Sequence, residues 1–166
     1  MIKRQKYPDM KPSDRTFFAV VGIMTVILAI IIILLIARQV FGNVVTKTVT
    51  IDLSMQNLSC FENGKRIDLF KISSGNKHHP DDGEDHSTPK GVFYIHDKKI
   101  DEYSGELKCP LPYCCWIIEY NIGIHAGYLP GYPASHGCIR LDLENAVKLY
   151  SWAPIGTKVT IYQGGK

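Results

Sequence analysis

The longest uninterrupted pattern in the chain is an uncharged apolar segment from Thr16 to Ala37, TFFAVVGIMTVILAIIIILLIA. A helix needs roughly 20 apolar residues to cross a bilayer, and this segment supplies them. Its apolar side chains occupy every face, whereas a helix packed on a globular core keeps one polar face. A cleavable signal peptide would have a shorter apolar region, about 7–15 residues, followed by a small-residue cleavage site. We therefore expect an uncleaved transmembrane helix over residues 16–37.

Beyond residue 44 the pattern changes to short segments in which apolar and polar residues alternate, as in half-buried strands. Four apolar residues of NVVTKTVTIDL fall on one face: Val45, Val49, Ile51 and Leu53. NLSCFENGKRIDLFKI predicts a hairpin that turns at Asn63-Gly64, because Asn-Gly between apolar runs is a strong hairpin signal. Further strands are predicted in four apolar runs: 91–96 (GVFYIH), 114–120 (CCWIIEY), 122–125 (IGIH) and 158–162 (KVTIY).

One helix is predicted in this part of the chain, after residue 141. Asp142 is a favourable N-cap, and Pro154 ends the segment. Four residues are expected to share its buried face: Leu143, Ala146, Val147 and Tyr150. The elements together predict a mainly β domain with one helix. The expected organisation is a basic tail over 1–15, a transmembrane helix over 16–37 and one folded domain over 44–166.

The distribution of basic residues predicts the orientation of the membrane helix. Five basic residues precede it: Lys3, Arg4, Lys6, Lys11 and Arg15. Only Arg38 and Lys47 follow closely, so the N-terminus is expected in the cytoplasm and the folded domain outside it. Residues 1–15 carry the whole net charge of +3, which leaves residues 16–166 neutral. A neutral outer domain argues against nucleic acid as a partner.

The chain has five cysteines: Cys60, Cys109, Cys114, Cys115 and Cys138. Disulfides persist outside the cytoplasm, and an odd count leaves at least one free thiol. If Cys138 is that thiol, the other four can pair in three ways. Cys114 and Cys115 would point to opposite faces of a strand and so need different partners. Five buried thiols remain the alternative.

The segment from residue 73 to 91, SSGNKHHPDDGEDHSTPKG, is polar and long for a simple connection. Seven of its residues are candidate cation ligands: His78, His79, Asp81, Asp82, Glu84, Asp85 and His86. Their spacing matches neither a closed zinc pattern nor an EF-hand loop. We therefore expect a solvated surface or active-site loop, and no metal.

Four residues with reactive or charged side chains lie within six positions of the segment YPASHGCIRLD, residues 132–142: Ser135, His136, Cys138 and Arg140. Cys138 follows Gly137, which lets the backbone approach a substrate carbonyl, and nearby N–H groups can bind an oxyanion. His125 ends a predicted strand, from which it can present a base to a thiol. Arg140 projects to the same side as Cys138 if the segment is extended, where it can bind an anionic group. A Cys/His zinc site that includes His136, or a structural disulfide at Cys138, stays open on this reasoning.

IHAGYLPGYPASHGCIRL resembles the active-site signature of the L,D-transpeptidase catalytic domain, the YkuD-like family. The signature is an upstream histidine, a loop, then Ser/Thr-His-Gly-Cys, an apolar residue and Arg or Asn. The resemblance covers most of residues 48–162, including the segments VTIDLSMQNLSCFENGK, KISSG, STPKGVFYI and GTKVTIY. It implies a β-sandwich-like, mainly β fold. The loop between His125 and Ser135 has nine residues, shorter than in many family members, so a reduced flap over the site is expected.

The resemblance implies that Cys138 is the nucleophile and that His125 is the acid and base, oriented by a backbone carbonyl. His136, Gly137 and Cys138 would line the oxyanion and substrate site, with Ser135 and Arg140 shaping it. The substrate class would be peptidoglycan stem peptides. The thiolate would release the terminal D-alanine, and an amine of a second stem would resolve the thioester as a 3→3 cross-link. Water as acceptor gives an L,D-carboxypeptidase, and a lipoprotein amine gives protein anchoring. No cofactor is implied.

Rival functions differ in the order and spacing of the same residue types. Sortases also use His, Cys and Arg, but their His lies far upstream and a Thr-Leu-x-Thr-Cys strand carries the thiol. Papain-like and NlpC-type peptidases place Cys before His, opposite to the order here. The rival from another class is a non-catalytic cell-wall or metal-binding membrane protein. Such a protein would keep its function after Cys138→Ala, and an enzyme would not.

Overall fold

The chain divides into two compact units, Met1–Val44 and Val45–Lys166. The structure is a computed structural model that describes residues 12–41, 45–119 and 121–165. Most of the predicted tail (residues 1–11), the predicted start of the folded domain at Val44, and residue 120 of one predicted strand lie outside the described residues.

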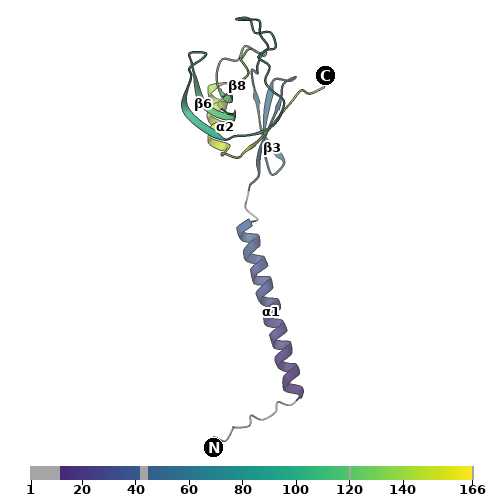
Figure 1. Cartoon of the computed structure of the whole chain (residues 1–166). Coiled ribbons are helices and arrows are strands. Elements are labelled where there is room, and N and C mark those ends of the chain that lie inside the picture. Colours follow the sequence, from purple (N-terminus) through teal and green to yellow (C-terminus); the bar gives the residue numbers. More distant parts are fainter. Residues whose placement is uncertain (1–11, 42–44, 120, 166) are drawn as a thin grey trace, which may run out of the picture. The chain divides into compact units, whose positions relative to one another are not determined.

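The described residues of the first unit form helix α1, over Pro12–Phe41 (Figure 1). It begins four residues before the predicted apolar segment. Proline is favourable in a first helical turn, because the N–H that it lacks would have no partner there. The stretch Thr16–Gln39 is long and apolar enough to cross a membrane. Its apolar side chains are exposed, as the absence of a polar face in the sequence predicts.

The second unit is built from two sheets (Figure 1). The first has the order β3-β2-β1-β9-β4, and its strands are β1 (Lys47–Asp52), β2 (Asn57–Glu62), β3 (Lys65–Lys71), β4 (Gly91–Tyr94) and β9 (Lys158–Tyr162). The second has the order β5-β6-β7-β8, and its strands are β5 (Asp97–Ser104), β6 (Cys109–Ile118), β7 (Ile122–Ala126) and β8 (Ile139–Leu141). Only the pairs β1–β9 and β7–β8 are parallel among the described strands.

The hairpin predicted between β2 and β3 is confirmed. Glu62 pairs with Lys65 across a two-residue turn. Asn63 and Gly64 both have positive φ values, 50° and 79°. A two-residue turn of this kind needs φ above zero at both positions, which Asn and Gly adopt most readily.

One core joins the two sheets and helix α2 (Leu143–Trp152), which packs beside β6 (Figure 1). Its fully buried residues come from both sheets and include Val49, Ile51, Ile124, Ile139 and Val159. The predicted mainly β, sandwich-like fold with one helix after the cysteine motif is therefore confirmed.

Helix α2 starts as predicted, since the Asp142 side chain accepts the N–H of Asn145. Its predicted buried face is only partly correct, since Ala146 is buried but Val147 and Tyr150 are only half-buried. Leu143 is 59% exposed, while Leu149 is 2% exposed and packs in the core with Ala146. The helix follows β8 with only Asp142 between them, so its first turn points to solvent and the buried stripe begins one turn later.

All five cysteines are free thiols, but the alternative of five buried thiols is only partly correct, since Cys109 and Cys138 are half-buried. Cys114 and Cys115 lie on opposite faces of β6, as expected of neighbours in a strand. Cys115 packs in the main core, and Cys114 packs in a second small cluster with Leu111 and Trp116. Burial raises the pKa of Cys115 to about 11, so this thiol stays protonated at neutral pH.

The expectation of a solvated loop over residues 73–91 is only partly correct. Ser73 and Ser74 are buried, and so are His79 and Thr88. Ser73 and Gly75 form isolated β-bridges to Arg140 and Ser135, which pins the start of the loop against the cysteine motif. The polar strand β5 was not predicted, because DKKIDEYS lacks the apolar alternation of a half-buried strand.

Candidate active site

The Cys138 thiol lies at the point where the chain enters β8. Its Sγ accepts the backbone N–H of Gly123, in β7, at 3.4 Å and lies 3.7 Å from the carbonyl oxygen of Asn121. Burial raises the pKa of Cys138, while the Gly123 N–H and the Arg140 charge oppose that rise. In the free protein the thiol is therefore protonated at neutral pH and needs a base to become a nucleophile.

His125 is the buried imidazole of this region and belongs to β7, which runs parallel to β8. Its Nδ1 lies 2.8 Å from the carbonyl oxygen of Ala126. A carbonyl only accepts, so this contact requires the proton on Nδ1 and leaves Nε2 as the basic nitrogen. Burial lowers the pKa of His125 to about 4, the bond to Ala126 raises it, and the Arg140 charge lowers it. The imidazole is therefore neutral at pH 7.

The segment between Ser135 and Cys138 is closed by its own hydrogen bonds. The Ser135 hydroxyl donates to the carbonyl oxygen of Cys138 and accepts the N–H of Gly137 at 3.2 Å. Gly137 has a φ of 108°, and a Cβ there would lie 2.7 Å from Ile122 Cδ1. Glycine is therefore favoured at this turn chiefly for its conformation, because the Ile122 side chain could shift to make room.

Thr88, from the distant polar loop, fixes the other side of this turn. Its buried hydroxyl donates to the carbonyl oxygen of Gly137 at 2.7 Å and accepts the N–H of Gly75 at 2.8 Å. Because one hydroxyl satisfies two buried backbone groups, it joins the loop to the cysteine motif. Thr88 was not predicted as a site residue, since a lone threonine gives no signal of such a contact.

Arg140 is anchored by its backbone and leaves its cation available. Its N–H and carbonyl pair with Ser73 at 2.9 and 3.0 Å. Its side chain runs past Gly127, where a Cβ would lie 3.1 Å from the Arg140 Cγ and Cδ atoms. Among the described residues, no carboxylate lies within ion-pair distance of its guanidinium. The cation is thus free to meet an anionic ligand.

A cavity of about 640 Å³ brings the predicted residues together. Five of the six line it: His125, Ser135, His136, Cys138 and Arg140. Gly137 is not among the lining residues. Much of the remaining lining comes from the β5–β6 hairpin, including Glu102 and Tyr103 of β5 and Leu107 of the turn. The hairpin therefore supplies more of the lining than the nine-residue loop before Ser135, which contributes Ala126, Gly127 and Tyr128.

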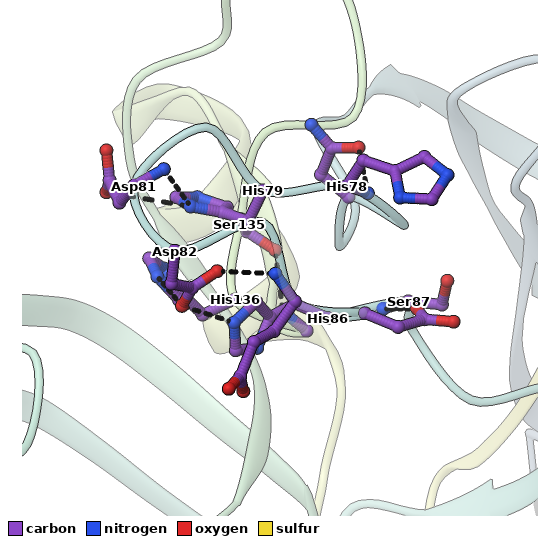
Figure 2. A network of polar contacts seen from close by, with 12 residues as sticks. His78, His79, Asp81, Asp82, His86, Ser87, Ser135 and His136 are labelled. Atoms are coloured by element: carbon purple, nitrogen blue, oxygen red, sulfur yellow. Dashed lines mark hydrogen bonds and ion pairs between the residues drawn. The ribbon is translucent and has the colours of Figure 1, made fainter.

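His136 lies in the same wall but faces a second group of polar residues (Figure 2). Its ring centroid is 3.7 Å from that of His79 and 4.6 Å from that of His86. Burial and these two neighbours lower the pKa of His136, and Asp82 raises it. The zinc site that we left open, with His136 beside Cys138, is not among the potential metal-ligand groups of the described residues.

The family description "L,D-transpeptidase catalytic domain", YkuD, matches residues 46–161, and the chain belongs to this family. An L,D-transpeptidase from Xylanimonas cellulosilytica is 31% identical, with a TM-score of 0.62 over 70% of this chain and 60% of that one. An L,D-transpeptidase from Stackebrandtia nassauensis is 28% identical, with a TM-score of 0.62 over 73% and 58%.

An L,D-transpeptidase from Mycobacterium smegmatis shares the fold at 17% identity, with a TM-score of 0.62 over 71% of this chain and 59% of that one. This chain thus spans less than two thirds of the length of these solved structures. The comparison with curated protein sequences gives no match.

Proposed function

We propose that the protein is a membrane-anchored cysteine L,D-transpeptidase that acts on peptidoglycan stem peptides. The observation that carries this proposal is a neutral imidazole, His125, and a protonated thiol, Cys138, in the wall of one cavity beside the free cation of Arg140. Membership of the L,D-transpeptidase catalytic domain family supports the same reaction class.

In the first half of the proposed reaction, Nε2 of His125 takes the Cys138 proton. The thiolate attacks the carbonyl carbon of the third stem residue, forming a C–S bond and a tetrahedral oxyanion. The Gly137 N–H already donates to Ser135, so the Cys138 N–H is the donor of this turn that we assign to the oxyanion. Collapse of the intermediate breaks the C–N bond. His125 returns the proton to the amine of the departing D-alanine.

In the second half, the amine of another stem attacks the thioester carbonyl. Its proton passes to His125, the C–S bond breaks, and Cys138 leaves as a thiolate that takes the proton back. The product is a 3→3 cross-link, and the cycle needs no net oxidant or cofactor. Arg140 binds a carboxylate of the stem, since among the described residues no carboxylate pairs with its guanidinium. The comparisons name transpeptidases and give no support to hydrolysis as the main reaction.

We further propose that α1 anchors the protein in the cytoplasmic membrane with the catalytic domain outside the cytoplasm. Its length and composition support a span, and the basic residues before it favour a cytoplasmic N-terminus. A protease added to intact spheroplasts should digest the second unit and spare an N-terminal tag. Digestion of the tag but not of the second unit would contradict this orientation.

The catalytic assignment is tested with Cys138→Ala and His125→Ala in the full-length chain. Each variant should lose turnover of a disaccharide-tetrapeptide by at least about 1000-fold, because nucleophile and base act as one unit. His78→Ala is the matched control, since His78 is an exposed histidine outside the cavity lining. Full turnover in either active-site variant would end the assignment.

A further inference from the structure

Three imidazoles from two distant segments meet beside the cavity. His79 and His86 lie in the polar loop, and His136 lies in the cysteine motif about 50 residues later. The ring centroids of His79 and His86 are 5.6 Å apart, and each of them lies nearer still to His136. Imidazole nitrogens are among the commonest ligands of zinc and related transition metals.

A carboxylate completes one of the groupings (Figure 2). The Asp82 Oδ2 atom lies 2.8 Å from His86 Nε2 and 4.0 Å from His136 Nε2. Ligand atoms placed tetrahedrally around zinc at about 2.0–2.1 Å lie roughly 3.3 Å from each other. The contact between Asp82 and His86 is a hydrogen bond, so His86 Nε2 would give up its proton to an ion. The three ligand atoms lie within 4.8 Å of one another, so shifts of about 1–2 Å would seat an ion.

The loop is already folded into the required shape by backbone contacts. The His79 N–H bonds the Glu84 carbonyl oxygen at 3.2 Å, and the Gly83 N–H bonds that of His79 at 2.7 Å. Gly83 has a φ of 77°, which lets the chain turn between Asp82 and His86. Metal binding would therefore order little new backbone, and its entropic cost would be small.

The remaining atoms around Asp82 suit a ligand role. Its other oxygen, Oδ1, accepts the Glu84 N–H at 2.9 Å, the kind of supporting bond that orients ligating carboxylates. The side chains of Asp82, His86 and His136 are 38%, 23% and 19% exposed, so an ion can reach them from solvent. Asp81, Glu84 and Asp85 lie nearby in the sequence and add negative charge that favours a cation.

From this geometry we propose that Asp82, His86 and His136 bind a divalent transition metal ion of the zinc class. Three protein ligands leave an open coordination position for water. The ion would cross-link the loop to the cysteine motif two residues before Cys138. This departs from the expectation of no metal that the spacing of the loop residues gave, because His136 is remote in the sequence and only the fold brings it to the loop.

A second grouping, His79, Asp81 and His136, shares one histidine with the proposed site. It is the weaker candidate for two reasons. The His79 Nδ1 atom already accepts the Asp81 N–H at 3.3 Å, so its lone pair is in use. The His79 side chain is also only 5% exposed, which restricts access of a hydrated ion.

The test is a titration of the full-length protein in detergent with Co²⁺ followed by competition with Zn²⁺. It is carried out in a Cys138→Ala background, so that the nearby thiol cannot supply a ligand. Visible absorption of bound Co²⁺ reports the coordination, and calorimetry with Zn²⁺ gives the affinity. Neither readout depends on transpeptidase activity, so the metal site is tested independently of the proposed function.

We expect saturable binding of one ion. Asp82→Asn and His86→Asn should each weaken metal affinity by about 100-fold, since even the loss of a residue that only supports a ligand weakens affinity by about 10- to 100-fold. Asp81→Asn and His78→Asn are the matched controls and should bind as the parent does. Absence of binding in the parent would overturn the proposal, as would unchanged affinity in Asp82→Asn. Loss in Asp81→Asn alone would assign the ion to the second grouping and refute the site proposed here.

Discussion

The burial of His125 makes the stability of the catalytic domain depend on pH in a way that one substitution can remove. The folded protein holds the pKa of His125 at about 4, against 6.5 for an unperturbed histidine. The unfolded chain therefore takes up this proton first as the pH falls. Stability is lost through His125 as the pH drops from about 6.5 towards 4.

The two pKa values set the size of the effect. Between pH 7 and pH 5 the linkage relation gives a loss of about 2 kcal/mol from His125 alone, and of about 3 kcal/mol by pH 4. The imidazole is 5% exposed, so solvent screening reduces this little. His125→Asn removes the titration, and its amide can still donate to the Ala126 carbonyl.

Urea unfolding measures the difference. Both tryptophans, Trp116 and Trp152, lie in the Val45–Lys166 unit, so their fluorescence reports the unfolding of that unit in the full-length chain. The loss of unfolding free energy from pH 7 to pH 5 should be about 2 kcal/mol smaller in His125→Asn than in the parent. The exposed control, His78→Asn, should keep the parent's slope. Equal slopes in the parent and His125→Asn would refute a buried, neutral His125.

Three further substitutions test other contacts of the site. Thr88→Val leaves two buried backbone groups unpaired and should cost about 3 kcal/mol in urea unfolding, while exposed Ser87→Ala should cost under about 0.5 kcal/mol. Arg140→Gln should lower kcat/KM for the stem peptide by about 10- to 100-fold, mainly through KM, and an unchanged KM would contradict its binding role. Gly75→Ala puts a Cβ 2.0 Å from a backbone oxygen and should destabilise by about 3 kcal/mol, unlike Gly105→Ala, where nothing lies within 4 Å.

Local signals in the sequence predicted most of the fold. The Asn63-Gly64 turn and the Asp142 cap depend on neighbouring residues, and both are confirmed. Strand β8 was not predicted, because three residues are too few to show alternation. Strand β5 is polar and exposed along much of its length, so its pairing with β6 has no apolar signature.

The candidate site was predictable where its residues are close in sequence or match the family signature. Ser135 to Arg140 form one segment, and His125 follows from the motif. Thr88 and the His86–His136 contact were missed, since they depend on where the polar loop lies after folding. The exposed first turn of α2 was missed because its orientation follows from the short connection to β8.

An acyl-enzyme at Cys138 is the most direct test of the proposed L,D-transpeptidase reaction. Intact-mass analysis of the full-length protein, incubated in detergent with a disaccharide-tetrapeptide stem, detects it together with the released D-alanine. We predict loss of D-alanine, a thioester that maps to Cys138 and is absent from Cys138→Ala, and then a cross-linked dimer of stems. An unmodified protein and an unchanged stem, with Cys138 shown to be reduced, would contradict the claim that this chain is a cysteine L,D-transpeptidase.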